Sequence, residues 1–74
     1  MTVNEFFYKG INIIVQVFGE QQFGFRGFVF YDDGNGITSE RITGGNYSFS
    51  NREEAFKYGS QYIRWVVDNN LHLN

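Results

Sequence analysis

Hydrophobic and polar residues alternate along the first half of the chain, in the pattern of half-buried β-strands. Between Ile11 and Phe18, one set of alternate positions is wholly aliphatic and the other mixes polar and apolar residues. The two sets are Ile11, Ile13, Val15 and Val17, and Asn12, Ile14, Gln16 and Phe18. Because successive side chains of a strand point to opposite faces, the pattern predicts a strand whose aliphatic set is buried.

The segment that follows, Gln22 to Tyr31, reads QFGFRGFVFY and holds five aromatic residues in ten, which favours a second strand. A turn is expected at Gly19 to Gln21. The aromatic strand is expected to stop at Asp32 to Gly36, where Asp, Asn and Gly favour a hairpin turn. A weaker third strand is predicted from Ile37 to Thr43. Three strands joined by short connections predict an antiparallel meander.

The N-terminal residues are predicted to lead into this sheet. Phe6 to Gly10 is a short apolar stretch in which Tyr8 to Gly10 begins or precedes the first strand. Residues 1–7 are expected to be loose or to cover the sheet.

A single helix is predicted after the strands. Ser50, followed three residues later by Glu53, is a capping-box pattern, so the helix is expected to start near Asn51. With about 100° between successive residues, the apolar side chains form one stripe along it. The stripe is Ala55, Gly59, Ile63 and Val66, flanked by Phe56, Val67 and Tyr62. The opposite arc is expected to be solvated, and consists of Glu53, Glu54, Lys57, Ser60, Gln61, Arg64 and Asp68.

Two features of this helix carry further expectations. Glycine weakens a helix by about 1 kcal/mol relative to alanine, so Gly59 in the apolar stripe predicts a close approach to the sheet. Tyr58, Tyr62 and Trp65 line the border between the two arcs. Packing at the edge of the core is the favoured interpretation of these rings, and a groove for a partner is the alternative.

Together these elements predict an α+β fold, in which a three-stranded antiparallel meander is packed by one C-terminal helix. Residues 1–74 are expected to form one domain, because 74 residues are close to the size at which a single core barely suffices. Nine Phe, five Tyr and one Trp indicate an aromatic core. Residues 71–74 are predicted to be a frayed tail.

The chain contains, in order, Tyr8-x-Gly10-Ile11, an alternating strand, an aromatic strand, a Gly-rich turn, Phe49-Ser50-x-x-Glu53-Glu54-Ala55-(x)3-Gly59 and Trp65. This order resembles a family of small, uncharacterised bacterial β-β-β-α proteins. The Glu-Glu-Ala start of the helix is also similar to the β-β-β-α part of HicB-type antitoxin domains. Both resemblances imply the fold and no activity, because the matching positions are caps, core and turns.

Composition narrows the classes of partner. The formal net charge of −2 gives no broad attraction to nucleic acid or anionic lipid. No apolar run approaches the roughly 18 residues of a membrane span, and the opening MTVNEFFYKG lacks the plan of a signal peptide. We therefore expect a cytoplasmic protein without a membrane partner.

Asp32 to Ile37 resembles the centre of an EF-hand calcium loop. Aligning Asp33 with the third ligand position puts Tyr31 at the first and Ile42 at the twelfth, where carboxylates are required. The segment is therefore predicted to be a hairpin turn and not a metal site.

Catalysis and cofactors are not expected. His72 is the one histidine and lies in the predicted tail, and the chain has no cysteine. The remaining residues assemble no nucleophile–base pair and no metal-ligand set. The sequence thus predicts a protein that is not an enzyme, with no catalytic residue, no metal site and no cofactor.

Arg26 to Phe30 resembles the RNP1 strand of RRM domains. However, Val29 replaces a small residue, Asp33 replaces the last aromatic, and strand follows strand where an RRM needs a helix. The RRM fold is excluded, yet one face of the strand still offers rings for base stacking and a guanidinium for phosphate. Single-stranded nucleic acid is therefore the alternative ligand, opposed by the scarcity of nearby cations.

The division of the rings between the two sheet faces decides what the aromatic strand can bind. Regular alternation puts Phe23, Phe25, Val29 and Tyr31 on one face, and Arg26, Phe28 and Phe30 on the other beside Ile14 and Phe18. A β-bulge at Gly27 would instead put Phe23, Phe25, Phe28 and Phe30 on the helix side. Regular alternation is favoured, because four rings need more room than one short helix leaves.

One helix covers one face, so regular alternation leaves an apolar patch, and such patches usually mark an interface. The patch can be closed by the Phe6-Phe7 segment, by a second subunit or by a ligand. The predicted function is that of a non-catalytic interaction module that forms a homodimer or binds another protein. Its candidate face is Arg26, Phe28, Phe30, Ile14 and Phe18, with Tyr58, Tyr62 and Trp65 as a secondary aromatic flank.

Overall fold

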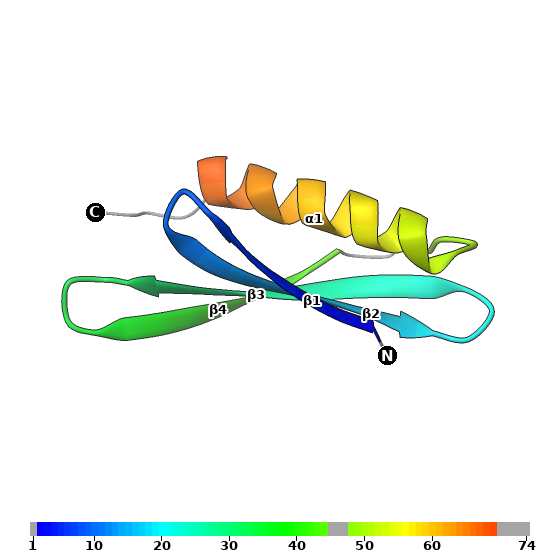
Figure 1. Ribbon diagram of the computed structural model, residues 1–74, viewed down its shortest axis with the longest axis horizontal. Coiled ribbons are helices and arrows are strands. Elements are labelled where there is room, and N and C mark those ends of the chain that lie inside the picture. The colour runs from blue at the N-terminus through cyan, green and yellow to red at the C-terminus, as the bar shows by residue number, and fades with distance from the viewer. Residues whose placement is uncertain (1, 45–47, 70–74) are drawn as a thin grey trace.

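The computed structural model describes residues 2–44 and 48–69 as an antiparallel sheet of four strands with one helix across one of its faces (Figure 1). The sheet order is β1-β2-β3-β4, so each strand pairs with its neighbour in sequence. The elements are β1 (Thr2–Tyr8), β2 (Ile11–Gly19), β3 (Phe23–Asp32), β4 (Ile37–Thr43) and α1 (Arg52–Asn69). The predicted α+β class with a C-terminal helix is confirmed.

The predicted number of strands is wrong, because the N-terminal lead is itself a strand. β1 pairs with β2 from Thr2↔Val17 to Tyr8↔Ile11. The connection is a two-residue turn in which Lys9 and Gly10 both have positive φ angles, of 53° and 78°. Such turns match the twist of a hairpin, although Lys-Gly is a weaker turn signal than Asn-Gly. Because β1 lies in the sheet, the Phe6-Phe7 segment extends the sheet and does not close its free face.

β3 is a regular strand with no bulge at Gly27. Its pairing with β2 runs without interruption from Gly19↔Phe23 to Asn12↔Phe30, and Gly27 lies opposite Val15. The pairing with β4 is equally continuous from Arg26↔Thr43 to Asp32↔Ile37. The regular alternation favoured from the sequence is confirmed.

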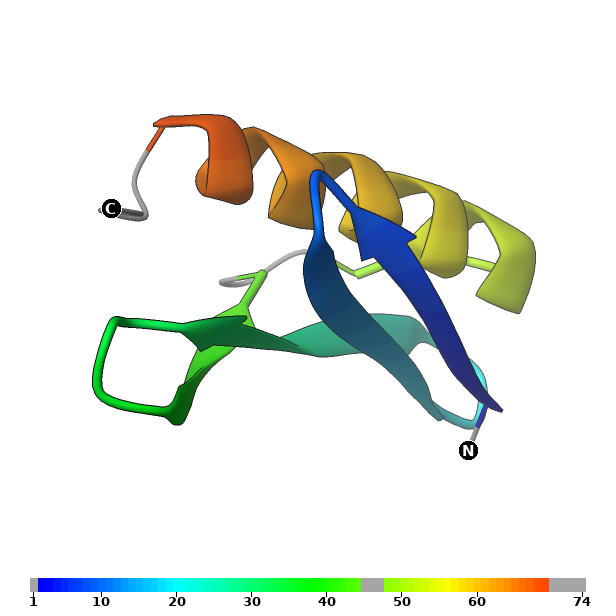
Figure 2. The same cartoon turned by 60° about the vertical axis from the view of Figure 1, so that its left-hand side comes forward.

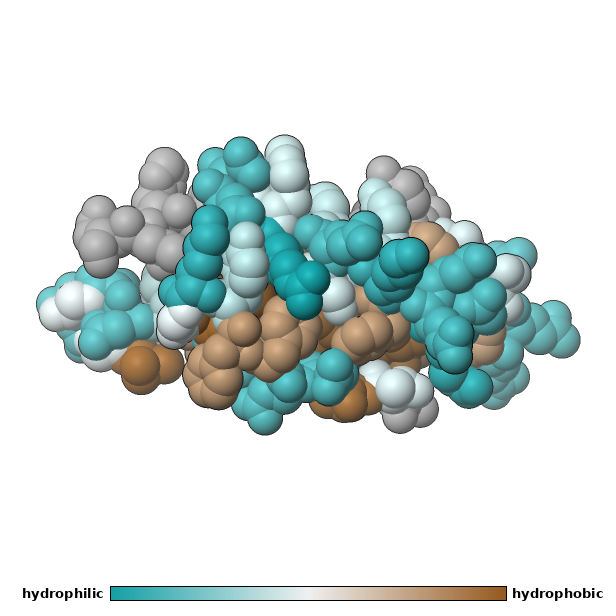
Figure 3. All heavy atoms as spheres, turned by 45° about the horizontal axis from the view of Figure 1, so that its top comes forward, coloured by the Kyte–Doolittle hydropathy of each residue, from teal (hydrophilic) through white to brown (hydrophobic). Residues whose placement is uncertain are grey.

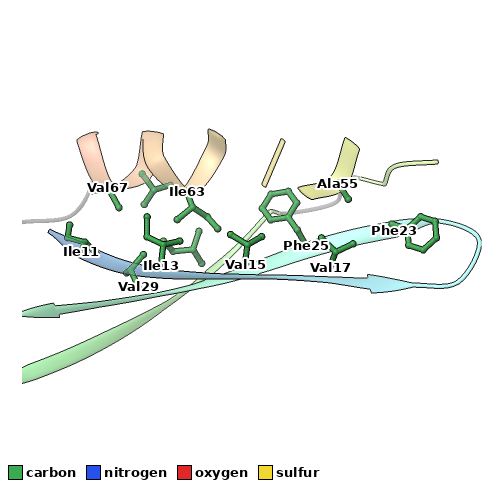
Figure 4. Close-up of a cluster of buried hydrophobic side chains, with 12 residues drawn as sticks. Ile11, Ile13, Val15, Val17, Phe23, Phe25, Val29, Ala55, Ile63 and Val67 are labelled. Atoms are coloured by element: carbon green, nitrogen blue, oxygen red, sulfur yellow. The ribbon is translucent and has the colours of Figure 1, made fainter. Parts of the chain in front are cut away.

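The core lies between the sheet and the helix. The aliphatic set of β2 is buried as predicted, and the drawn core side chains all lie on the helix side of the strands (Figure 4). The buried hydrophobic residues are Ile11, Ile13, Val15, Val17, Phe23, Phe25, Val29, Ile42, Ala55, Ile63, Val66 and Val67. The helix packs mainly on β2 and β3, and the turn of the β3–β4 hairpin extends beyond it (Figures 1 and 2).

The close approach predicted at Gly59 is present. A Cβ on Gly59 would lie 2.7 Å from Cγ of Phe25, so the ring of Phe25 fills the space that a larger residue would need. Phe25 is 4% exposed. The absence of a side chain at Gly59 lets the helix rest directly on this ring.

The helix starts one residue later than its predicted cap implies. Asn51, and not Ser50, is the N-cap, because its Oδ1 accepts a 2.8 Å hydrogen bond from the backbone N–H of Glu54. The N-cap and the residue three positions after it are therefore Asn51 and Glu54, and not Ser50 and Glu53 as predicted. Asn is at least as good a cap as Ser, so the pattern shifts by one residue at little cost.

The outer arc of the helix is exposed as predicted, except at Ser60. Seen from above and in front, the upper layer is largely hydrophilic, and hydrophobic side chains gather below it (Figure 3). Ser60 is buried, with 6% of its surface exposed. It faces Asn4 and Phe6 of β1. The prediction that Ser60 is solvated is wrong because it left out this strand.

The segment that resembles an EF-hand is the β3–β4 turn. The carboxylates of Asp32 and Asp33 accept 2.8 Å hydrogen bonds from the backbone N–H groups of Gly34 and Asn35. These are local turn bonds of the kind that Asp commonly makes. The predicted hairpin turn is confirmed. His72 and the predicted frayed tail lie outside the described residues.

Candidate interaction face

The sheet face opposite the helix is covered by no element among the described residues (Figures 1 and 2). Residues directly opposite each other in an antiparallel sheet share a face, so the three registers define rows that cross all four strands. The rows on this face are Phe7–Asn12–Phe30–Ser39, Glu5–Ile14–Phe28–Arg41 and Val3–Gln16–Arg26–Thr43. We call these twelve residues, with Phe18 at one end and the opposed pair Asp32 and Ile37 at the other, the open face.

All five residues of the predicted face lie on the open face: Arg26, Phe28, Phe30, Ile14 and Phe18. Phe18 is 40% exposed, and the other four are half-buried. Ile14 and Phe28 pair directly and form the centre of the middle row. The sequence therefore identified the centre of the face.

Three further hydrophobic residues of the open face were missed. Phe7 is 72% exposed, Val3 is 55% exposed and Ile37 is 75% exposed. Phe7 and Val3 belong to the strand that the prediction left out, because TVNEFFY does not alternate regularly between polar and apolar residues. Of the five large hydrophobic residues that are exposed among the described residues, four lie on the open face, and Trp65 is the other.

The polar side chains of the open face bind one another across the strands. Nε of Arg26 donates a 2.9 Å hydrogen bond to Oε1 of Gln16, and its guanidinium lies 5.1 Å from the ring centre of Phe18. Nδ2 of Asn12 donates a 2.8 Å hydrogen bond to Oε2 of Glu5. These contacts hold the polar groups beside the half-buried apolar centre.

The secondary aromatic flank is divided between core and surface. Tyr58 and Tyr62 pack against Phe25, with ring centres 5.8 and 6.0 Å from it. Trp65 stacks on Tyr62 at 6.2 Å and is 53% exposed. The two tyrosines thus serve the core, as the favoured interpretation expected, and Trp65 is the exposed end of the row.

A shallow groove of about 350 Å³ runs between β1 and the helix. Its lining residues are Asn4, Phe6, Phe56, Lys57, Ser60, Gln61 and Arg64. The guanidinium of Arg64 lies 4.9 Å from the ring centre of Phe6, in a cation–π contact. This groove was not predicted, because it exists only where β1 passes beside the helix.

The perturbed titratable groups lie on the helix side of the sheet, away from the open face. Lys9 forms an ion pair with Asp68, and the Tyr8 hydroxyl donates a 2.8 Å hydrogen bond to the same carboxylate. The hydrogen bond from Lys9, aided by that from Tyr8, lowers the pKa of Asp68. The hydrogen bond to Asp68 and the negative charge of its carboxylate raise the pKa of Lys9. Partial burial, with a hydrogen bond to Glu40, raises the pKa of Tyr31. Asp68 is exposed, as predicted, and it also ties the helix to the β1–β2 turn.

Among residues 2–44 and 48–69, no three His, Cys, Asp or Glu side chains lie close enough together to hold a metal ion. Over the same residues, no helix combines the length and the apolar character that a membrane crossing requires.

No protein-family model, curated protein sequence or solved structure matches this chain. The resemblance to small bacterial β-β-β-α proteins stays a prediction.

Proposed function

We propose that this protein is a non-catalytic interaction module of the cytoplasm, which binds protein through the open face and forms a homodimer. The observation that carries the proposal is the gathering of exposed hydrophobic residues on the one face that the helix leaves uncovered. Exposed apolar surface costs free energy in water, at roughly 25 cal/mol for each Å², and a partner removes that cost.

The composition of the open face supports protein as the partner. Its centre is the half-buried apolar pair Ile14 and Phe28, and exposed hydrophobic side chains lie toward its edges and ends among polar ones. Protein interfaces likewise combine aromatic and other apolar side chains with polar ones. A second copy is the simplest partner, because symmetric homodimers are the commonest soluble oligomers.

Analytical ultracentrifugation of the wild type and of two variants tests the proposal. Phe28→Asp places a charge at the centre of the face, and Phe7→Asp places one at a side chain that is 72% exposed. Gln61→Asp, on the exposed arc of the helix, is the matched control. We expect a dimer for the wild type and Gln61→Asp, and a monomer for both Phe variants.

Circular dichroism shows whether each variant keeps its fold. Phe7→Asp is the safer variant, because its side chain contributes little to the core. A wild type that is monomeric at high micromolar concentration, or a dimer that survives both Phe variants, would falsify the proposal.

Single-stranded nucleic acid is the second candidate ligand. It is favoured by the position of Phe28, which pairs directly with Arg41 and lies two residues from Arg26 on the same face. A ring between two guanidinium groups suits base stacking with phosphate contact. Against it, Arg26 is already bonded to Gln16, and the chain carries a net charge of −2.

Fluorescence anisotropy with short single-stranded DNA and RNA, at low and at high salt, tests this candidate. Binding that weakens steeply with salt, and weakens further in Arg41→Gln, would support it. Absence of binding at low salt would end it, because electrostatic attraction is strongest there.

A further inference from the structure

We infer that the second copy binds with its strands in reversed order, so that Glu5 of each copy meets Arg41 of the other. The inference rests on the proposed function, and it adds the geometry and the charge pairing of the dimer.

The middle row of the open face carries the first observation. Consecutive registers place Glu5 opposite Ile14, Ile14 opposite Phe28, and Phe28 opposite Arg41. The row therefore has an acid at the β1 edge, a base at the β4 edge and two apolar side chains between them. Reversed end for end, the row is complementary to itself.

The two charges are available to a partner. Neighbouring strands are about 4.8 Å apart, so the backbones of Glu5 and Arg41 are separated by about 14 Å and their charged groups are held apart. Both residues are exposed, and among the described residues neither belongs to an ion pair. Glu5 accepts one hydrogen bond from Asn12 through Oε2.

When the strands of the two sheets are aligned, two symmetric arrangements bring the open faces together. A two-fold axis parallel to the strands places β1 over β4 of the partner, so that Glu5 opposes Arg41 at both edges and Ile14 opposes Phe28 in the centre. An axis across the strands places β1 over β1 and opposes like charges at both edges. Juxtaposed like charges disfavour an interface, so the first arrangement is selected.

The neighbouring rows agree with this choice. Reversal of the row Val3–Gln16–Arg26–Thr43 places Gln16 opposite Arg26, a pair whose groups already form a hydrogen bond within one chain. Reversal of the row Phe7–Asn12–Phe30–Ser39 opposes no two charged groups. The strands of the two sheets then run within about 30° of each other, as in aligned sheet packing.

The size of the face suits a weak, reversible pair. Four strands about 4.8 Å apart, with seven residues rising about 3.3 Å each, make a face of roughly 19 by 23 Å. Two such faces amount to roughly 870 Å² in total, which is below the roughly 1,200 Å² of standard interfaces and in the range of weak, transient ones.

Charge exchange between the two edges tests the arrangement. Glu5→Arg alone leaves two cations at each edge of the dimer, and Arg41→Glu alone leaves two anions. We expect each single variant to weaken the homodimer about tenfold at low salt, and less at high salt. The double variant Glu5→Arg/Arg41→Glu restores opposite charges and is expected to dimerise like the wild type.

A mixture of the two single variants gives a second readout. Each edge of the mixed dimer would again hold opposite charges, so native mass spectrometry is expected to find the heterodimer in preference to either homodimer. Glu53→Arg and Lys57→Glu, both on the exposed arc of the helix, make the same changes of net charge as controls and are expected to leave the dimer unchanged.

The outcomes separate this inference from the function on which it rests. Single variants that dimerise as tightly as the wild type would overturn the arrangement and leave the open-face dimer standing. Single variants that weaken the dimer without rescue by the double variant would overturn it as well. If analytical ultracentrifugation finds the wild type to be a monomer, both the proposed homodimer and this arrangement of it are wrong.

Discussion

The side chain of Ile63 occupies the space that a Cβ on Gly27 would need, since such a Cβ would lie 2.1 Å from Cδ1 of Ile63. Gly27 is in the middle of β3, and Ile63 is fully buried on the helix. The glycine in the aromatic strand therefore marks a place where a helix side chain packs against the backbone of β3, and not a break in the strand.

Gly27→Ala is expected to destabilise the protein by about 2 kcal/mol, because overpacking a well-filled core typically costs about 1–3 kcal/mol. Urea denaturation followed by circular dichroism measures the change. Gly24→Ala is the matched control on the same strand. Its Cβ would lie 3.0 Å from the ring of Phe18, which is 40% exposed and can move aside, so its cost is expected to be smaller.

The same contact predicts a coupling between Gly27 and Ile63. Ile63→Val removes a methyl group from the crowded end of the side chain and costs about 1 kcal/mol by itself. The double variant Gly27→Ala/Ile63→Val is expected to lose less stability than the sum of the losses in the two single variants. A double-mutant cycle measures this difference. Simple additivity would mean that the two groups do not compete for space.

Gly59→Ala is expected to destabilise the protein, although the same change stabilises most exposed helix positions by about 1 kcal/mol. The reason is the ring of Phe25, whose Cγ would lie 2.7 Å from the new Cβ and which is itself buried. Gln61→Gly and Gln61→Ala, at an exposed position of the same helix, measure helix propensity without packing. If Gly59→Ala stabilises the protein, the ring of Phe25 can shift to accommodate the new Cβ and the predicted clash is absent.

Asn51→Ala is expected to cost about 1 kcal/mol of stability, the usual loss for an N-cap. Ser50→Ala is expected to cost much less, because the hydrogen bond to the N–H of Glu54 comes from Asn51. Denaturation of the two variants side by side checks the assignment. If Ser50→Ala loses as much stability as Asn51→Ala, or more, Ser50 contributes to the cap and the assignment to Asn51 alone is wrong.

The contact among Lys9, Tyr8 and Asp68 predicts a pH dependence. The pKa of Asp68 is lowered in the folded state, so its contribution to stability is present at neutral pH and is lost as the pH falls through that lowered pKa. The pKa of Lys9 is raised, so its contribution persists until the pH rises through that raised value. Both contributions are present at neutral pH.

NMR titration of the Asp68 carboxyl group measures this effect. Lys9→Met is expected to raise the pKa of Asp68 toward its ordinary value, and Tyr8→Phe is expected to raise it less, because Lys9 is the larger cause. Lys57→Met, which removes a cation elsewhere on the helix, is the control. An Asp68 pKa that stays low in Lys9→Met would assign the effect to another group.

Local patterns were sufficient to predict most of the elements. β4 was predicted with its observed bounds, and the bounds of β2 and β3 were predicted to within one residue. Alternation and turn residues are properties of neighbours in sequence, which is why they can be read without the fold. The helix was found in the same way, with its cap misplaced by one residue.

The elements that were missed depend on contacts between distant segments. Neither face of β1 is wholly apolar, and its residues become part of a strand by pairing with β2. Without β1, no pattern along the chain indicated that Ser60 would be buried or that Phe7 and Val3 would lie on the open face. A weak edge strand of this kind is stabilised by the sheet that it joins and not by its own pattern.

The amino-acid sequence by itself determined which residues share a face of each strand, because side-chain alternation has a period of two. At Gly27 it favoured regular alternation over a β-bulge without deciding between them, because glycine also suits a bulge. Only the tertiary structure decided the question, by placing Ile63 over Gly27 and so turning Phe28 and Phe30 away from the helix. It also brought Glu5 and Arg41 into one row, since register between strands is set by pairing across the whole sheet.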